Sequence, residues 1–219
     1  MNNKISPSIL AADFNKLGSE IAIVEEEGAD YLHIDVMDGV FVPSISFGMP
    51  VIKSIRKKSK LFFDVHLMIV DPERYIKTFA ECGADGITVH LEASKDIDKT
   101  LSMIRESGKK TGLAISPETP VSDISDDLLR KTDMVLVMTV RPGFGGQKYM
   151  EECTGKIKEV RTRVEELGLQ TDIEVDGGID RETITTVMNA GANVIVMGSS
   201  IFNGDPGQNM DYYRKVLGI

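Results

Sequence analysis

Histidine and aspartate side chains alternate along two apolar segments of the chain, in a pattern that suits metal coordination. In YLHIDVM, His33 and Asp35 share one face if the segment is a strand, because alternate side chains of a strand point the same way. The later segment DVHLM carries the same residue types in the opposite order, as Asp64 and His66. Imidazole and carboxylate groups together suit Zn, Fe, Mn or Co, whereas an all-oxygen set would suit Mg.

A further candidate ligand follows an apolar run near the other end of the chain. In IEVDGG, Asp176 stands after the run and before two glycines that allow another group to approach the backbone closely. His33, Asp35 and His66 would supply three ligands from adjacent strands, and Asp176 would supply a fourth. These four residues are our candidate metal site.

Each of these residues also has a purely structural interpretation. A single histidine on an apolar strand is often a core imidazole, and an Asp before Gly is often a turn or helix-capping residue. Several such side chains at the ends of different strands weaken that interpretation. We interpret Asp38, which begins a DG turn, and Asp64, which lies deeper in its strand, as structural.

Three glycine-rich turns follow successive apolar runs in the second half of the chain. They are RPGFGGQ at 141–147, DGG at 176–178 and GSS at 198–200. Consecutive N–H groups in such turns, before helices, can converge on an anion. The sequence lacks GxxxxGK[ST] and GxGxxG, so a phosphate site is favoured over a nucleotide or dinucleotide site.

The elements that must position these residues alternate along the whole chain. Eight short β-branched runs are expected to be strands: KISPSIL, YLHIDVM, LFFDVHLM, GITVHLE, KTGLAIS, MVLVMTV, TDIEVDG and NVIVMGS. Helical patterns lie between them, at 14–27, 72–81, 97–106, 149–167, 181–189 and 205–217. This alternation predicts an α/β protein with a single (β/α)8 TIM barrel domain over residues 1–219, with a doubly wound open sheet as the alternative.

The amino-acid composition excludes several kinds of binding partner and cofactor for this protein. The 219 residues carry a net charge of -9, and basic residues are scattered apart from RKKSK, which argues against nucleic acid. No apolar stretch approaches the roughly 20 residues that span a bilayer, so we expect a cytoplasmic protein without membrane contact. Cys82 and Cys153 have no Cys or His at ligand spacing, so neither a disulfide framework nor a zinc clip is expected.

The motifs together resemble a known family. ISPSILAAD, YLHIDVMDGVFVP, FDVHLM, VMTVRPGFGGQKYM, EVDGGI and MGSSIF closely resemble, in order and spacing, the motifs of ribulose-phosphate 3-epimerase, over essentially the whole chain. The resemblance implies a (β/α)8 barrel of the pentose phosphate pathway that interconverts D-ribulose 5-phosphate and D-xylulose 5-phosphate with one divalent metal ion per subunit. Zn, Fe, Mn and Co remain open for that ion, and a homo-oligomer is expected.

The resemblance also assigns roles to residues. It implies that His33, Asp35, His66 and Asp176 bind the metal, and that Asp35 and Asp176 also move protons. The implied substrate-binding positions are Ser8, His66, Gly143, Phe144, Gly145, Gly146, Gly177, Gly178, Gly198 and Ser199. Met37, Met68 and Met138 are candidates for a polarizable pocket wall. Two positions depart from or vary within the family pattern, Ser44 in place of the usual Asn and Arg141 before PGFGGQ, and neither is a proposed ligand or acid–base residue.

The chemistry agrees with this assignment. Inverting C3 beside a C2 ketone requires a proton to leave one face and another to return to the opposite face, so two acid–base groups must flank the carbon. Asp35 and Asp176 would be these groups, with a metal-stabilised enediolate between the two proton transfers.

Other functions remain open at this stage. An epimerase for another ketose phosphate, such as allulose 6-phosphate, would need the same groups. Phosphate-binding decarboxylases need Asp-x-Lys where this chain has Asp64-Val65-His66, and a Schiff-base aldolase needs a lysine at the mouth of the barrel. A binding protein without catalysis would need none of the four candidate ligands.

Overall fold

Strands and helices alternate along the chain in the computed structural model, which describes residues 2–219. Within that range the strands are β1 (Lys4–Pro7), β2 (Tyr31–Met37), β3 (Phe62–Met68), β4 (Gly86–His90), β5 (Lys110–Ile115), β6 (Met134–Met138), β7 (Asp172–Asp176) and β8 (Val194–Met197). All eight described strands pair in parallel in one sheet, in the order β1-β8-β7-β6-β5-β4-β3-β2. The predicted alternation of strand and helix is confirmed.

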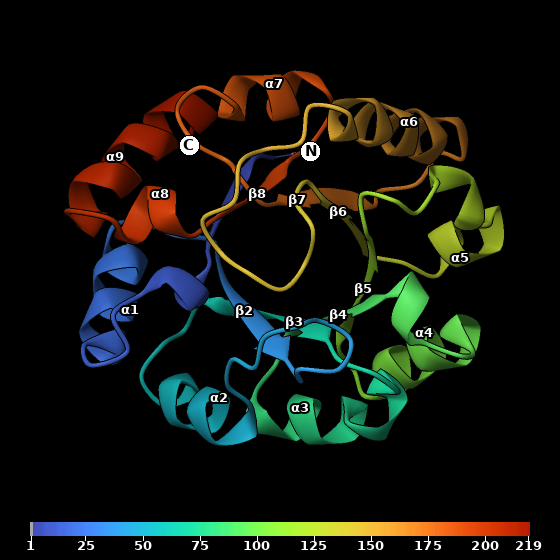
Figure 1. Cartoon of the computed structure of the whole chain (residues 1–219), viewed down its shortest axis with the longest axis horizontal. Coiled ribbons are helices and arrows are strands. Elements are labelled where there is room, and N and C mark those ends of the chain that lie inside the picture. The colour runs from blue at the N-terminus through green and yellow to red at the C-terminus, as the bar shows by residue number, and fades with distance from the viewer. Residues whose placement is uncertain (1) are drawn as a thin grey trace.

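The sheet curls into a barrel that is nearly closed. Its two end strands, β1 and β2, meet through a parallel bridge between Ser8 and His33. The backbone N–H of Asp30 also donates to the carbonyl of Ile5, at 3.1 Å, and the N–H of Ile5 donates to the Asp30 carboxylate, at 2.9 Å. Figure 1 shows the strands as an inner ring with the helices around them. The predicted (β/α)8 barrel is therefore confirmed.

The described helices form the outer layer. They are α1 (Leu17–Glu26), α2 (Met49–Arg56), α3 (Ile76–Cys82), α4 (Ile97–Glu106), α5 (Asp126–Arg130), α6 (Cys153–Glu166), α7 (Ile184–Asn189), α8 (Ser199–Phe202) and α9 (Pro206–Leu217). Short 3-10 turns are η1 (Ile9–Ala11), η2 (Pro72–Arg74), η3 (Leu91–Ala93) and η4 (Val121–Asp123). Helices α2, α5 and α8 lie outside the helical patterns expected from the sequence. Helices α5 and α8 have only five and four residues, which is too few turns to show a hydrophobic period.

The predicted helices that begin too early do so for local reasons. The predicted start at residue 14 is wrong because Asp13 makes a turn there, in which its carboxylate accepts from Asn15 N–H and its carbonyl from Lys16 N–H. Residues 149 and 150 belong to a loop instead of α6, because Met150 N–H donates to the carbonyl of Thr139 at 2.9 Å. The predicted helix at 72–81 is divided into η2 and α3.

Strand β2 shows how the barrel separates core from site. Leu32, Ile34 and Val36 are buried in the main apolar cluster, which includes residues of the surrounding helices. His33 and Asp35 alternate with them and point into the barrel, where they contact side chains of β3. The two-residue period of the strand therefore aims both polar side chains inward, as the sequence predicts.

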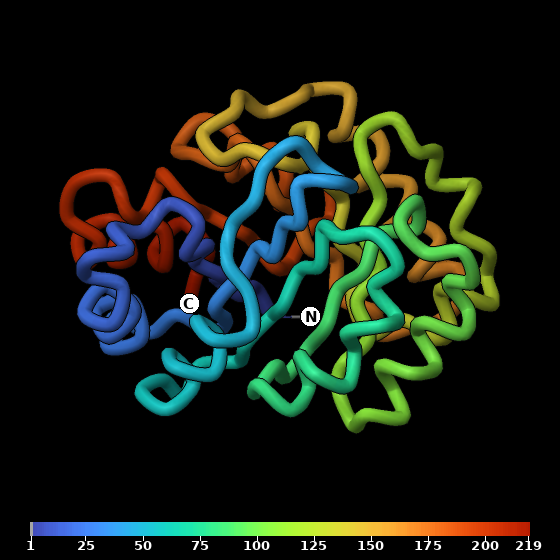
Figure 2. Tube along the Cα trace, turned by 60° about the horizontal axis from the view of Figure 1, so that its bottom comes forward, coloured from blue at the N-terminus to red at the C-terminus, as the bar shows by residue number. Residues whose placement is uncertain are grey.

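The loops that follow the strands lie at one end of the barrel. Figure 2 shows the loop after β2, in light blue, and the long loop after β6, in yellow, at the end away from both chain termini. Parallel barrels build their sites at this carboxyl end of the strands. Among residues 2–219, no helix combines the length and apolarity needed to cross a membrane, and both cysteines are buried free thiols.

Candidate active site

The candidate metal ligands come together at the carboxyl end of the barrel. Strands β2 and β3 pair in a register that places Asp35 opposite His66 and His33 opposite Asp64. Asp176 is the last residue of β7, on the other side of the barrel. One ligand atom from each of His33, Asp35, His66 and Asp176 lies within 4.8 Å of all the others. The structure thus brings the four predicted residues into one cluster.

The distances within this cluster suit a small cation. His33 Nε2 lies 3.2 Å from Asp35 Oδ1 and 3.8 Å from Asp176 Oδ2. His66 Nδ1 lies 3.1 Å from the same Asp35 oxygen and 3.4 Å from His33 Nε2. Ligands about 2.0–2.2 Å from a divalent ion are separated from each other by roughly 3–3.6 Å. The separations among His33, Asp35 and His66 fall in this range and that between His33 and Asp176 is slightly longer, so the four residues could hold a divalent metal, with His33 offering Nε2 and His66 offering Nδ1.

The charges in the cluster favour a cation. Burial alone would lower the pKa of His33, but the carboxylates of Asp35 and Asp64 outweigh burial and raise that pKa well above its ordinary value. Burial opposes ionisation of Asp35, yet His33 and His66 hold its pKa below the ordinary range. The carboxylates thus attract positive charge to a buried site, where water screens the attraction less than at the surface.

The two candidate acid–base carboxylates differ in their environment. The side chain of Asp35 is only 4% exposed, and its Oδ2 accepts from the Ser8 hydroxyl at 2.6 Å. The side chain of Asp176 is 19% exposed. Burial, followed by the nearby charge of Asp35, raises the pKa of Asp176 to about 7. In the absence of a metal ion, Asp35 therefore favours its ionised form, while Asp176 takes up a proton as pH falls through about 7, a contrast that suits an acid–base pair.

A second group of polar side chains lies beneath the cluster. Asp64 Oδ2 is 2.7 Å from His33 Nδ1, which is hydrogen-bond length, and Thr88 Oγ1 donates to Asp64 Oδ1 at 3.3 Å. Glu174 Oε1 lies 3.4 Å from the same His33 nitrogen. Burial and the charge of Asp64 raise the pKa of Glu174 well above its ordinary value. We interpret this group as the support that orients His33.

Sequence reasoning underestimated this support. Asp64 remains a structural residue, as predicted, but it contacts a candidate ligand directly. Glu174 was overlooked, although it shares a face of β7 with Asp176, two residues away, and this spacing is a usable signal. Sequence reasoning assigned no role to His90, because its contact with His66 depends on the packing of β3 against β4. By contrast, Asp38 is a turn residue, as predicted, and accepts from the N–H groups of Val40 and Phe41.

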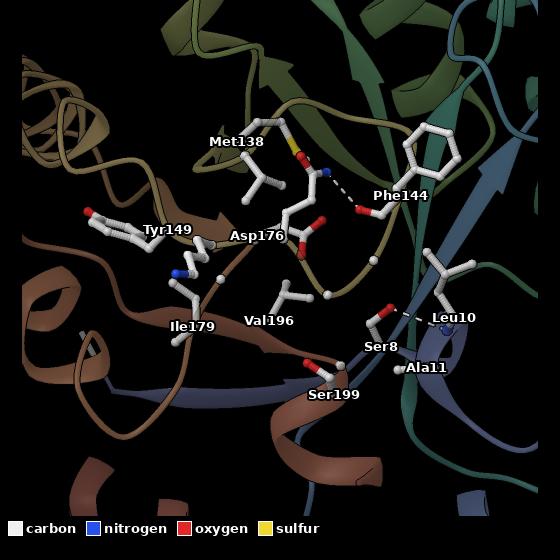
Figure 3. Close-up of a pocket in the computed structure, with 18 of the residues that line it drawn as sticks. Ser8, Leu10, Ala11, Met138, Phe144, Tyr149, Asp176, Ile179, Val196 and Ser199 are labelled. Atoms are coloured by element: carbon white, nitrogen blue, oxygen red, sulfur yellow. Dashed lines mark hydrogen bonds between the residues drawn. The ribbon is translucent and has the colours of Figure 1, made fainter.

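A cavity of about 520 Å³ opens above the cluster. Figure 3 shows Ser8, Asp176 and Ser199 around it, with Met138 on one side. The sequence-predicted residues that line the cavity are Ser8, Asp35, Met37, Met68, Met138, Gly143, Phe144, Gly145, Gly146, Asp176, Gly177, Gly178, Gly198 and Ser199. His33 and His66 are fully buried beneath it and are not part of its lining.

Backbone packing explains the glycines in the turn after β7. Gly178 has φ +68°, and a Cβ there would lie 2.2 Å from the backbone nitrogen of Tyr149. At Gly177, with φ +118°, a Cβ would lie 2.3 Å from a methyl group of Val140. The turn after β7 therefore packs against both ends of the long loop that follows β6. This close approach places the backbone of both segments on one side of the cavity.

The long loop is held by its own side chains. Gln147 Nε2 donates to the carbonyls of Arg141, at 2.7 Å, and Phe144, at 2.8 Å. Arg141 points away from the cluster and pairs with Glu118 at 2.6 Å on the surface. Ser44 lies in the turn after β2, where its carbonyl accepts from Gly39 N–H at 2.9 Å. Neither of the two positions that depart from or vary within the family pattern is among the four clustered residues.

Comparison with known proteins agrees with this geometry. Residues 4–202 match the model of the ribulose-phosphate 3 epimerase family. The chain is 49% identical to ribulose-phosphate 3-epimerase of Synechocystis over 100% of this chain and 93% of the relative. It is also 49% identical to the Bacillus subtilis protein of the same name, over 91% and 92% of the two chains. Among solved structures, a mutant tryptophan synthase alpha-subunit from Pyrococcus furiosus covers both chains fully with a TM-score of 0.70 at 16% identity, which is a likeness of fold.

Proposed function

Because the chain belongs to the ribulose-phosphate 3-epimerase family, we propose that it interconverts D-ribulose 5-phosphate and D-xylulose 5-phosphate by proton transfer at C3. This reaction would place the protein in the pentose phosphate pathway. The observation that carries the proposal is the pair Asp35 and Asp176, two carboxylates that face one cavity from strands β2 and β7.

The two carboxylates would divide the proton transfers between them. In one direction Asp35 removes the C3 proton, because it is ionised and lies at the floor of the cavity. Asp176 then delivers its own proton to the opposite face of C3, and the roles reverse in the other direction. The Ser8 hydroxyl donates to Asp35 Oδ2 and holds the carboxylate plane in place.

His33, Asp35, His66 and Asp176 would hold one divalent ion. When bound, such an ion supplies Lewis-acid stabilisation of the negative charge that develops on the substrate oxygens. The protein's own contribution is to keep both imidazoles oriented and the site dry, since His33 and His66 are fully buried. The donor set is compatible with Zn, Fe, Mn or Co.

The phosphate would bind at the glycine-rich side of the cavity. The turn after β7, the loop after β6 and the start of α8 line that side together. Backbone N–H groups in such turns can bind phosphate without a lysine. The distance between this side and the carboxylate pair would then select a ketose phosphate with its C3 above Asp35.

Proton exchange tests the proposal directly. The protein is incubated with D-ribulose 5-phosphate in deuterated water, with a divalent metal and separately with a chelator, and C3 is followed by NMR. We expect D-xylulose 5-phosphate to form with deuterium at C3 only in the metal-loaded sample. If fully metallated protein gave neither exchange nor product, the proposed epimerase activity would be refuted. If the substrate were decarboxylated or cleaved between two carbons, the protein would be assigned that reaction in place of epimerisation.

One variant tests the acid–base role of Asp176. Asp176→Asn keeps the shape of the side chain but cannot cycle a proton, so turnover should fall by at least about 100-fold, the lower part of the usual range for acid–base groups. Circular dichroism and the melting temperature show whether the variant remains folded. Retained turnover would remove Asp176 from the acid–base pair.

A further inference from the structure

A chain of two histidines leads from the candidate ligand cluster to a glutamate at the barrel mouth. His66 Nε2 lies 2.9 Å from His90 Nε2, and the two rings stack with their centroids 5.0 Å apart. His90 Nδ1 lies 3.1 Å from Glu92 Oε2. His66 and His90 are fully buried, whereas the Glu92 side chain is 27% exposed. These contacts thus connect Asp35, which lies beside His66 Nδ1, to the loop that follows β4.

Counting hydrogens shows what this chain requires. Three contacts occur in series: Asp35 with His66, His66 with His90, and His90 with Glu92. Each of these contacts joins two N or O atoms and needs one hydrogen between them. A neutral imidazole ring carries only one N–H hydrogen. Two neutral rings therefore satisfy two of the three contacts. A cation between Asp35 Oδ1 and His66 Nδ1 would remove the need for the third hydrogen.

The direction of the remaining hydrogens then follows. A ring nitrogen that binds a metal must offer its lone pair, so His66 would carry its hydrogen on Nε2 and donate to His90 Nε2. His90 must accept there, which leaves its hydrogen on Nδ1, where it donates to Glu92. Only an acceptor at the position of Glu92 satisfies this arrangement.

Other contacts hold Glu92 in its accepting role. Glu92 Oε1 accepts from the Ser116 N–H at 2.8 Å and from the Thr119 hydroxyl, both in the loop after β5. These contacts leave Oε2 for His90. The ring of Phe41, from the loop after β2, packs against His90 with a centroid distance of 4.9 Å. Three loops thus position Glu92 and His90 relative to each other.

We infer that Glu92, acting through His90, is a positioning residue that fixes the tautomer of His66 and presents the Nδ1 lone pair to a metal ion. The inference rests on the proposed metal site and adds two residues, His90 and Glu92, that do not line the cavity. The two candidate histidine ligands are then oriented differently. His33 is held directly by the buried Asp64, whereas His66 is held through a relay that ends at the barrel mouth.

An isosteric substitution at Glu92 can test the relay. In Glu92→Gln the amide has only one oxygen, and the two donors Ser116 N–H and Thr119 Oγ1–H draw it to their side. The amide NH2 group would then face His90 Nδ1 and favour a hydrogen on His90 Nε2. The hydrogen on His90 Nε2 would then point at the hydrogen that a metal-bound His66 carries on its own Nε2, and the two would repel each other. The matched control is Thr119→Val, which removes a hydrogen bond of the same carboxylate but leaves its contact with His90.

The measurements are made on the full chain with Zn²⁺ alone. Zn²⁺ affinity is measured by competition with a chromophoric chelator, and ring protonation by ¹⁵N NMR of the Zn²⁺-loaded protein, which has only three histidines. We expect wild-type His90 to carry its hydrogen on Nδ1. We also expect Glu92→Gln to weaken Zn²⁺ binding roughly 10- to 100-fold, as for other residues that orient a ligand, while Thr119→Val stays within about threefold.

The possible results separate the relay from the metal site. Wild-type affinity in a folded Glu92→Gln variant would overturn the relay while the metal site stands. Zn²⁺-loaded wild-type protein with the His90 hydrogen on Nε2 would also overturn it, whether or not the variant folds. Wild-type protein that binds no divalent ion would overturn the proposed metal site and the relay together.

Discussion

The Ser8 hydroxyl donates to Asp35 Oδ2 at 2.6 Å, while the other oxygen of the same carboxylate faces His33 and His66. The two oxygens of Asp35 are therefore divided between two tasks. Oδ1 contacts the two candidate histidine ligands, and Oδ2 contacts Ser8, which lines the cavity. This hydrogen bond lies across the junction that closes the barrel, because Ser8 follows β1 and Asp35 is on β2.

Removing the Ser8 hydroxyl should lower turnover more than metal affinity. In Ser8→Ala, Asp35 loses a charge-assisted hydrogen bond, which is typically a contribution of about 1.5–3 kcal/mol, so kcat/KM should fall roughly 10- to 100-fold. Zn²⁺ affinity should change little, because Oδ1 keeps its neighbours. Steady-state kinetics and chelator competition measure the two effects.

Ser6→Ala is the matched control for that substitution. Ser6 lies two residues earlier on β1 and is buried, but its hydroxyl has no hydrogen-bond partner among the described residues. Its removal should leave kcat/KM within about threefold, since no bond is lost. Equal losses in both variants would show that the effect of Ser8 arises from barrel packing and not from Asp35.

Removing metal should lower both activity and stability. A ligand that binds the native state alone stabilises it by RT ln(1 + [L]/Kd), or about 2.7 kcal/mol at a concentration 100 times Kd. Dialysis against a chelator should therefore abolish epimerisation and lower the melting temperature by several degrees, and added Zn, Fe, Mn or Co should reverse both changes. In Asp176→Asn the metal-dependent rise in melting temperature should be smaller. Full activity in verified metal-free protein would contradict the proposed role of the metal.

The proton on Asp176 should make the stability of metal-free protein depend on pH. Burial and Asp35 raise its folded pKa to about 7, above the ordinary value of 3.8, so the native state binds more protons between these values. The stabilisation from that proton is complete below about pH 4 and is lost as pH rises through 7. Metal-free Asp176→Asn has no proton to lose at this position. The difference in free energy of unfolding, variant minus wild type, should therefore increase from pH 5 to pH 8.

Urea unfolding of both metal-free proteins at several pH values measures this difference. The increase can be at most about 2.7 kcal/mol, because pH 5 lies two units below a pKa of about 7, and it should be on the order of 1–2 kcal/mol because part of the Asp176 side chain reaches water. A difference that is constant from pH 5 to pH 8 would show that Asp176 titrates in its ordinary range.

A methyl group at Gly178 should displace the long loop after β6. The added Cβ would lie 2.2 Å from Tyr149 N, and at φ +68° any other residue is strained. Gly178→Ala should therefore lower the free energy of unfolding by about 2–4 kcal/mol, the sum of backbone strain and overpacking, and raise KM for the sugar phosphate. Urea unfolding and steady-state kinetics measure these changes.

Gly168→Ala is the control that measures the cost of backbone strain without overpacking. Gly168 has φ +64° at the end of α6, and no described atom lies within 4 Å of an added Cβ. It should lose only about 1 kcal/mol of stability and leave KM unchanged. If Gly178→Ala matched this control in both measurements, the close approach between the turn after β7 and Tyr149 would have no role in binding.

Local patterns were sufficient to predict much of this molecule. The two-residue period of β2 placed His33 and Asp35 on one face, and the βα alternation predicted the barrel and the end of it where polar residues should gather. These features depend only on residues close in the chain, because a strand alternates its side chains whatever its neighbours are. The same locality explains the errors at helix starts, where a turn at Asp13 or a loop contact of Met150 replaces the first helical turn.

Tertiary structure decided which atoms meet. The pairing of Asp35 with His66 depends on the register between β2 and β3, and the approach of Asp176 depends on the curvature that brings β7 across the barrel. Glu92 is held beside His90 by hydrogen bonds from Ser116 and Thr119 in the loop after β5. Such contacts join segments 20 or more residues apart, and no local period specifies them. The amino-acid sequence by itself therefore determined the set of reactive side chains, and the closed barrel decided their partners, their protonation and their roles.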